Sequence, residues 1–421
     1  MDTGRIANRK LERSRLSVPG ESPGQWSHME SAAVHAPSKR FTFIDAWRGI
    51  AALWVAFYHY YGAVSHDYHQ HLFVQPLHYL FSKGNAGVEI FFVISGYVIA
   101  YSIRQKRITP GYFGRFMLRR SIRLEPPYWA TIAVAIAVLW VSNHLRPDHF
   151  VALPGGPRIL AHIFYLQGFF HVQNIVGVFW TLCIEVQFYV FFLLLVAGSQ
   201  LLGDRRISRL AVLLPFTLAS LAIQAHWVQG SGPWMFKFWY LFQLGVLAYW
   251  AVSKQVRDTD FATYALVVLA ILCWHPFFLG FTGWMTGVGF YLAGKFGRLG
   301  TLDYAPLQFL GRRSYSFYLI HFVIGMPFVT YFPEIFFGKF LPTGVAIASM
   351  VTAVAVSLMG ATVLYHFVER PCINFGRTLK HSALKRKQIA HPTKIAVAAS
   401  LPGPLYLTNP SLIESPVSQQ D

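Results

Sequence analysis

Long apolar stretches constrain the fold of this chain more than any other feature of the sequence. Runs of roughly 17 to 25 residues, the length that a helix needs to cross the hydrocarbon layer of a membrane, follow one another along most of the chain. Hydrophobic residues make up 54% of the 421 residues and charged residues 13%, which is unlike an average soluble protein. We therefore predict an all-α integral membrane protein with about ten transmembrane helices, near residues 43–62, 86–103, 124–142, 176–202, 208–226, 235–252, 260–279, 281–296, 314–333 and 343–368.

The basic residues indicate how these helices are oriented. Lys and Arg concentrate in the leading tail, in every second connection and in the trailing tail, whereas the remaining connections contain few of them. Because short cytoplasmic loops collect Lys and Arg, this alternation places both termini in the cytoplasm. The same rule accounts for the formal net charge of +18. We therefore predict membrane lipids as partners and no nucleic acid.

The composition divides the chain into three parts. Residues 1–40 are polar, lack the apolar core of a signal peptide and are predicted to be a disordered cytoplasmic tail. Residues 41–376 form the predicted membrane domain, and residues 377–421 a second polar, largely disordered cytoplasmic tail. The chain is thus expected to be a multi-pass protein of the inner or plasma membrane. Cys183, Cys273 and Cys372 have no metal-ligand spacing and are interpreted as packing residues.

The first apolar segment, FIDAWRGIAALWVAFYHYYG, contains Asp45, Arg48 and His59. Arg48 and His59 are eleven positions apart, which places them on one helical stripe and about 16 Å apart along the axis. An ionisable group at membrane depth usually faces a protein interior or a water-filled cavity and has a function. A structural alternative is an Asp45–Arg48 pair near the inner interface, with His59 as an ordinary interfacial residue.

Three other predicted helices also contain polar groups at membrane depth. In the fourth helix, Thr181 and Tyr189 flank Glu185 at four-residue spacing and therefore share its face. Two acids and two histidines in separate helices exceed what helix packing needs, although Ser95 and Ser316 are interpreted first as interhelical hydrogen-bond residues. The candidate residues are Glu89 and Ser95 in the second helix, Trp180, Glu185 and Gln187 in the fourth, and Ser314, Tyr318 and His321 in the ninth.

Four arginines precede the third apolar run, in GRFMLRRSIRLEPPYW. Arg115, Arg119, Arg120 and Arg123 recur at three- and four-residue spacing, so a helix there carries much of its guanidinium charge on one side. Such a cluster can hold anionic lipid at the inner surface. It can also bind the phosphates of a nucleotide-like donor, for which bidentate guanidinium groups are well suited.

The histidines of HDYHQH do not form a convincing metal site. His66, His69 and His71 fall in an expected external loop without regular helical spacing, and paired metal-ligand histidines are missing elsewhere. No Walker loop, Rossmann glycine fingerprint or nucleophile-elbow serine motif occurs in the sequence. We therefore predict no metal and no bound cofactor.

Five motifs in order, over about residues 41 to 376, resemble the acyltransferase-3 family of integral membrane proteins, which includes O-antigen and exopolysaccharide O-acetylases. The motifs are the Arg48-to-His59 spacing, GVEIFFVISGYVI, the RxxR of Arg120 and Arg123 before LEPPYW, FWTLCIEVQFY, and SYSFYLIH. The resemblance implies transfer of an acyl group, most often acetyl, from cytoplasmic acyl-CoA to a hydroxyl of a carbohydrate or glycolipid acceptor at the other face. It also implies that Arg48 and His59 are essential and that the RxxR handles the donor.

This chemistry gives each candidate residue an expected role. His59 is the expected general base, oriented by Glu185 or Glu89, and an acyl-histidine route is the second choice. Arg48 is expected to be a donor or gate residue. The expected donor site contains Arg119, Arg120, Arg123 and Tyr128, and the expected substrate cavity contains Ser95, Trp180, Gln187, Ser314, Tyr318 and His321. The alternative function is a proton-coupled transporter that uses the same His and Glu residues.

Overall fold

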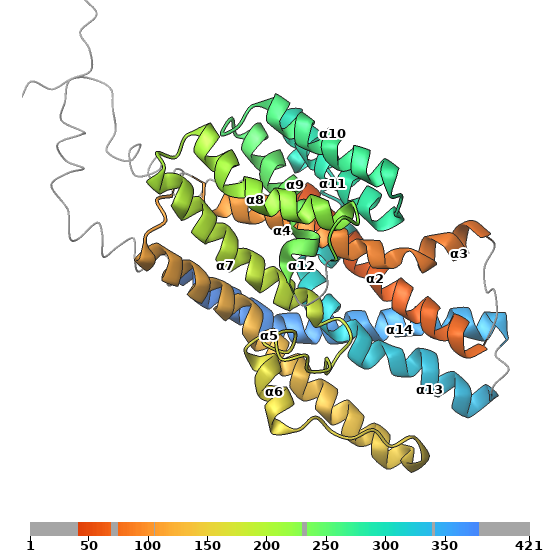
Figure 1. Ribbon diagram of the computed structural model, residues 1–421. Helices are drawn as coiled ribbons and strands as arrows, with labels where there is room; N and C mark the ends of the chain where they lie inside the picture. The colour runs from red at the N-terminus through yellow and green to blue at the C-terminus, as the bar shows by residue number, and fades with distance from the viewer. Residues whose placement is uncertain (1–40, 69–74, 105, 230–233, 339–341, 379–421) are drawn as a thin grey trace, which may run out of the picture.

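The computed structural model describes residues 41–68, 75–104, 106–229, 234–338 and 342–378. These residues form helices joined by short connections, with no strand among them (Figure 1). The tail predicted at 1–40 and nearly all of the one predicted at 377–421 lie outside the described residues. The elements are α2 (Thr42–Tyr68), α3 (Gln75–Ser82), η1 (Gly84–Ala86), α4 (Gly87–Ser102), α5 (Pro110–Leu145), η2 (Pro147–His149), α6 (Gly156–Ile163), α7 (Trp180–Leu201), α8 (Arg206–Gln224), η3 (Met235–Phe238), α9 (Trp239–Val252), α10 (Asp258–Trp274), α11 (Phe278–Lys295), η4 (Arg298–Gly300), α12 (Ala305–Ile320), η5 (His321–Gly325), α13 (Met326–Phe337), α14 (Thr343–Leu364) and η6 (Tyr365–Glu369).

Six helices in the described part of the chain are long and apolar enough to cross a membrane, and they coincide with six of the predicted segments. They are Gly84–Ser102, Pro110–Leu145, Trp180–Leu201, Arg206–Gln224, Ala305–Phe337 and Thr343–Thr378. The chain is therefore a multi-pass membrane protein. The other four predicted segments coincide with α2, α9, α10 and α11. These four helices do not meet the same criterion, so the count of ten stays a prediction.

The helix α9 is surrounded by other helices on nearly every side. All but one of its 14 residues are buried, as expected of a helix that is apolar on every side. It packs most extensively on α4, and a pair of glycines sets the distance between the two backbones. A Cβ atom on Gly96 would lie 2.0 Å from the carbonyl oxygen of Phe242, and one on Gly245 would lie 2.0 Å from that of Val93. Small residues at such crossings are the usual way in which membrane helices approach closely.

A second crossing of this kind joins α2 to α12, far apart in the sequence. A Cβ on Gly311 would lie 2.1 Å from the carbonyl oxygen of Asp45, and one on Gly49 would lie 2.8 Å from the Cβ of Leu310. In Figure 1, α10 and α11 lie at the upper edge of the bundle and α5 and α6 at the lower edge. The close approach at Gly49 and Gly311 determines which residues of α2 and α12, the first and ninth predicted helices, meet.

The helix α5 begins fourteen residues earlier than the predicted segment 124–142. It starts at Pro110, where the side chain of Thr109 accepts a hydrogen bond from the backbone of Tyr112 (3.2 Å). Its first turns contain the arginine-rich segment, and the apolar-run criterion missed them because that segment is amphipathic rather than apolar. All four arginines of the segment are therefore helical, as their spacing indicated.

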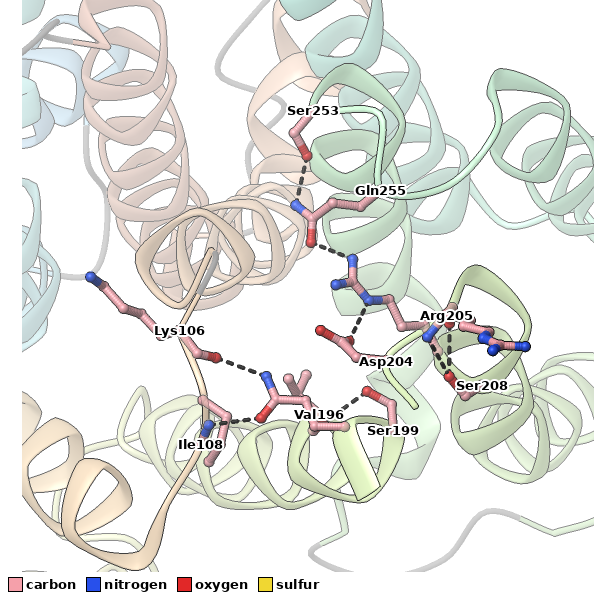
Figure 2. A network of polar contacts seen from close by, with 11 residues as sticks. Lys106, Ile108, Val196, Ser199, Asp204, Arg205, Ser208, Ser253 and Gln255 are labelled. Carbon is pink, nitrogen blue, oxygen red and sulfur yellow. Dashed lines mark hydrogen bonds and ion pairs between the residues drawn. The ribbon is translucent and has the colours of Figure 1, made fainter. Parts of the chain in front are cut away.

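A polar network anchors the connection that leads into α5 (Figure 2). The side-chain amide of Gln200, near the end of α7, accepts a hydrogen bond from the backbone N–H of Ile108 and donates one to the carbonyl of Lys106, both at 2.8 Å. Beside it, the guanidinium of Arg209 donates to the side chain of Gln255 (2.5 Å), which follows α9. The connection into α5 is thus tied to the end of α7, and the start of α8 is tied to the residues that follow α9.

The connection between α6 and α7 is held by a buried histidine. His162 bonds the carbonyl of Arg158 through Nδ1 (2.7 Å) and accepts a hydrogen bond from the backbone N–H of Ile175 at Nε2 (3.0 Å). Burial lowers the pKa of the His162 imidazole, and accepting at Nε2 requires the neutral ring. His162 is therefore a structural residue that shapes the approach to α7.

The two glycine environments predict opposite effects of the same substitution. We expect Gly245→Ala to lower the free energy of unfolding by about 1 to 3 kcal/mol, because its Cβ would overlap the α4 backbone. The matched control is Gly289→Ala on α11, whose Cβ would meet nothing within 4 Å. This variant should raise the free energy of unfolding by up to about 1 kcal/mol, because alanine favours a helix more than glycine does. Denaturant unfolding in detergent measures both, and shifts of the same sign would contradict the proposed role of the crossing.

Candidate functional site

A narrow cavity of about 80 Å³ lies between α2, α4, α5, α7 and α12. Its polar lining contains several of the residues that the sequence singled out. The polar lining residues are Arg48 from α2, Ser95 from α4, Arg120 and Arg123 from α5, Thr181, Glu185 and Tyr189 from α7, and Ser314, Tyr315 and Tyr318 from α12. The three α7 residues that were expected to share one face, Thr181, Glu185 and Tyr189, thus line the same cavity.

The charges of the cavity do not balance. Three guanidinium groups, those of Arg48, Arg120 and Arg123, line it together with one carboxylate, Glu185. The carboxylate accepts hydrogen bonds from the hydroxyls of Ser95 (2.6 Å) and Tyr189. The Nε–H of Arg123 is buried and has no hydrogen-bond partner within the described chain. A cavity with this excess of cationic donors is suited to a ligand that brings negative charge and acceptor atoms.

The two ends of the cavity differ in chemistry. At one end, the guanidinium of Arg120 lies 5.2 Å from the ring centre of Tyr189. At the other, the hydroxyls of Thr181 and Tyr318 are 2.9 Å apart, and the Phe91 ring packs on Tyr318 with centroids 5.5 Å apart. Thr181 and Tyr189 are eight residues apart on α7, so about 12 Å of helix separates the two ends. The cavity therefore leads from a cationic end to an uncharged end of aromatic rings and hydroxyls.

A pair of histidines lies next to the uncharged end. The ring of His321 is 5.8 Å from that of Tyr318, centroid to centroid. Its Nε2 is 3.0 Å from Nδ1 of His59, and the two imidazoles are stacked with centroids 5.2 Å apart. His321 is fully buried, whereas His59 is partly exposed. His59 is thus the accessible member of the pair, and His321 is the member enclosed by the protein.

The hydrogen bonds determine which nitrogen of His59 is free to take a proton. Nδ1 of His321 faces two backbone carbonyls, those of Tyr318 (2.8 Å) and Phe317 (3.2 Å), and must therefore donate. In the neutral ring its Nε2 then carries a lone pair and can only accept. His59 consequently donates from Nδ1, which leaves the lone pair on Nε2 of His59. This is the tautomer that a general base needs, selected by a second histidine.

The segment that carries His321 is held from two sides. His321–Gly325 forms a π-helical turn, a feature common at functional sites. The buried hydroxyl of Tyr60 donates to the carbonyl of His321 (2.9 Å) and lies 2.7 Å from the hydroxyl of Ser357 on α14. A Cβ on Gly325 would lie 2.0 Å from the Tyr60 oxygen, so only glycine fits there. The position of His321 therefore depends on α2 and α14 together.

The expectation that Glu185 or Glu89 orients His59 does not match this geometry. Nδ1 of His59 pairs with His321, and Glu185 is engaged by Ser95 and Tyr189. Glu89 lines a different pocket. The physical reason is that spacing orders residues along a helix but does not give the rotation of α4 and α7 about their axes.

Four further candidates also lie outside the lining of the cavity that contains Arg48, Arg120 and Arg123, which we call the arginine cavity. Trp180 lines the same second pocket as Glu89. The side-chain oxygen of Gln187 accepts a hydrogen bond from the backbone of Met235 (3.1 Å). The fully buried ring of Tyr128 stacks on Tyr165 with centroids 4.9 Å apart. Arg119 is partly exposed and does not line the cavity.

The structure also shows polar residues that sequence reasoning missed or described only structurally. Tyr315 lines the cavity and donates to the carbonyl of Leu124 on α5 (2.7 Å). Ser316, interpreted as an interhelical residue, donates to the buried carboxylate of Glu369 (2.6 Å). The acid could have been found as an ionisable group at the end of the last apolar run. Ser95 is likewise interhelical, because it bonds Glu185 on α7.

The described residues contain no group of three or more His, Cys, Asp or Glu side chains placed to hold a metal ion. His69 and His71 of the HDYHQH segment lie outside the described residues, as does the side chain of His66. Cys183 is buried, Cys372 partly buried and Cys273 exposed, and none of the three forms a disulfide.

Comparisons with known proteins agree with the membrane fold and with the sequence motifs. The chain is 26% identical over 337 residues to a Komagataeibacter xylinus protein provisionally named membrane-bound transacylase BcsY, covering 73% of this chain and 78% of that one. It is 24% identical to the provisionally named peptidoglycan O-acetyltransferase YrhL of Bacillus subtilis, covering 74% of this chain and 53% of that one. It is 25% identical to a provisionally named O-acetyltransferase of Staphylococcus aureus, covering 78% and 56%.

The chain thus spans about half the length of the last two relatives. No solved structure matches it. The sequence model of the acyltransferase-3 family, described as an acyltransferase domain, matches residues 41–362. The chain therefore belongs to the acyltransferase-3 family.

Proposed function

We propose that this protein transfers an acyl group, acetyl in the first instance, from cytoplasmic acyl-CoA to a hydroxyl of a carbohydrate or glycolipid acceptor at the extracytoplasmic side. One observation carries the proposal. His59, whose free lone pair is on Nε2, pairs with His321, and the ring of His321 lies 5.8 Å from that of Tyr318 at the uncharged end of a cavity whose other end is lined by arginines. Family membership supports a transferase over the alternative of a proton-coupled transporter.

The proposed topology has ten spans, with both termini in the cytoplasm. The basic connections then all face inward, including the one before α5. The start of α2, the first half of α5 and the start of α12 share this side. The cationic end of the cavity accordingly opens toward the cytoplasm, and the histidine pair lies nearer the other face.

The arginines are proposed to bind the donor. Arg120 and Arg123, three residues apart on α5, present guanidinium groups to the same cavity as Arg48. Phosphate groups are the natural partners of planar, bidentate donors. The cavity is too small for a whole nucleotide. We therefore place the phosphates at its cationic mouth. The pantetheine arm also exceeds about 80 Å³, so we propose that the helices move apart to admit it and that its thioester is directed toward Tyr318.

His59 is proposed to act as the general base. Its Nε2 accepts the acceptor's hydroxyl proton while the oxygen attacks the thioester carbonyl carbon. The carbon–sulfur bond breaks, the proton passes from the imidazolium to the leaving thiolate, and the products are an ester and free CoA. His321 accepts the Nδ1–H of His59 throughout and keeps the ring in the required tautomer. In the second route, Nε2 itself attacks the thioester, the CoA thiolate leaves, and an acyl-histidine forms. The acceptor's hydroxyl then takes the acyl group, His59 is released, and the hydroxyl proton goes to the thiolate.

The first prediction for this function concerns the histidine pair. We expect His59→Ala to reduce transfer by a factor of about 100 to 10,000, because the general base is lost. His321→Leu should also reduce the rate, since the tautomer of His59 is then no longer selected. His321→Gln should retain more activity than His321→Leu, because its amide oxygen can still accept from Nδ1 of His59. The readout is base-labile label transferred from radiolabelled acetyl-CoA to the glycans of membrane vesicles.

The matched control is His144→Ala, which changes an exposed histidine of α5. It should transfer label at the wild-type rate. Full transfer by His59→Ala would overturn the catalytic assignment, and equal rates for the two His321 variants would overturn the tautomer argument.

The second prediction concerns the donor. We expect Arg120→Lys and Arg123→Lys each to raise the KM for acetyl-CoA by about tenfold to a hundredfold, because one charge-assisted bidentate contact is lost. Arg115→Lys is the control, since Arg115 lies on the same helix but is exposed and outside the cavity lining. Initial rates at varied acetyl-CoA measure the difference. Equal KM values for all three variants would overturn the proposed role of Arg120 and Arg123 in binding the donor.

A further inference from the structure

A second and larger pocket, of about 610 Å³, opens where six helices end or begin. It lies between η1 and the start of α4, the starts of α7, α9 and α11, and the ends of α8 and α10. Its polar lining includes Asn85, Glu89, Lys237, His226 and His275. The mechanism uses none of these residues. The pocket adjoins the arginine cavity, because Val88 lines both.

Two hydrogen-bond acceptors in this pocket are buried and unpartnered. Oε2 of Glu89 and Oδ1 of Asn85 have no hydrogen-bond partner within the described chain. Glu89 is only 5% exposed, and both residues line the pocket. The two residues are four positions apart at the start of α4 and therefore share one face. Because buried polar groups are normally paired, a ligand that brings hydrogen-bond donors is expected here.

The two cavities have opposite hydrogen-bond deficits. The arginine cavity contains an unpaired guanidinium N–H and excess positive charge, so it lacks acceptors. In the second pocket the two unpartnered buried atoms are acceptors, and its one carboxylate is accompanied by the ammonium group of Lys237. An acyl-CoA phosphate suits the first and not the second. A neutral molecule with several hydroxyl groups suits the second.

An aromatic wall adds a further preference. Trp180 is 37% exposed and lines the pocket together with Phe238, whose ring centroid is 5.5 Å away. Aromatic rings beside a few fixed polar groups are typical of small-molecule sites. The C–H face of a sugar ring packs on such a surface while its hydroxyls reach the side. The Trp180 ring also lies 6.4 Å from Phe92, a residue of the arginine cavity.

We propose that this pocket binds an uncharged sugar unit of the acceptor, neighbouring the unit that is acylated. The inference rests on the proposed function for the identity of the acceptor. Glu89 and Asn85 accept hydrogen bonds from the sugar's hydroxyls, and Trp180 supports its ring. Binding energy from this remote unit positions the reacting hydroxyl of the next one. Glu89 is thus a binding residue rather than a partner of His59.

Glycan-array binding by the full chain in detergent tests this proposal without requiring acyl transfer. The probe is an array of neutral and acidic oligosaccharides, and the protein carries a fluorescent label. We expect wild type to bind neutral glycans and Trp180→Ala, Glu89→Leu and Asn85→Leu each to lose about tenfold in affinity. The controls are Trp140→Ala and Glu334→Leu, which remove an exposed tryptophan of α5 and an exposed glutamate of α13.

The outcomes separate this proposal from the proposed function. Array binding that the pocket variants lose and the controls keep supports the pocket, even if wild-type vesicles transfer no label from acetyl-CoA; in that case the proposed function alone fails. Label transfer without array binding, or equal binding by wild type and pocket variants, overturns the pocket. A thermal melt of each variant shows whether it is folded. Because three substitutions are tested independently, the other two still test the proposal if one variant does not fold.

Discussion

The crossing of α2 on α12 is the contact on which the candidate site depends. Gly49 and Gly311 let the two backbones touch, because any side chain at Gly311 would overlap the Asp45 carbonyl. This contact brings His59 within hydrogen-bond distance of His321, and it places Arg48 in one cavity with Ser314 and Tyr318. A wider crossing would separate His59 from His321 and open the cavity wall at the same time.

The unfavourable free energy of placing several arginines inside the helix bundle is the second constraint on the structure. Isolated charges at membrane depth are unfavourable, and one carboxylate, Glu185, faces three guanidinium groups. Aromatic rings reduce the cost in part, since Arg120 lies over both Phe116 and Tyr189. The remaining excess is what an anionic ligand would neutralise. A lipid headgroup at the surface would not require guanidinium groups inside the bundle, so the enclosure of Arg48 and Arg123 favours a ligand that enters.

Sequence reasoning predicted those parts of the site that depend on one helix alone. Apolar runs gave the positions of the helices, and four-residue spacing gave the shared faces of Thr181, Glu185 and Tyr189. Sequence reasoning did not predict which residues of different helices contact one another. The pairing of His59 with His321 depends on a glycine crossing and a π-helical turn, and neither has a clear sequence signature. The early start of α5 escaped it because amphipathic turns lower local hydropathy.

Glu89 shows most clearly why rotation about a helix axis matters for function. Its depth is similar to that expected for His59, and a carboxylate beside a histidine is a familiar arrangement, so sequence order alone favoured a partnership. On the observed face of α4, Glu89 and Asn85 instead present unpaired acceptors to a pocket next to Trp180, while Val88, Phe91 and Ser95 face the arginine cavity. One helix thus lines two cavities whose unpaired groups have opposite hydrogen-bond character. In the proposed function, which joins a cytoplasmic donor to an outer acceptor, these two faces of α4 would keep the two substrate sites distinct while Val88 borders both.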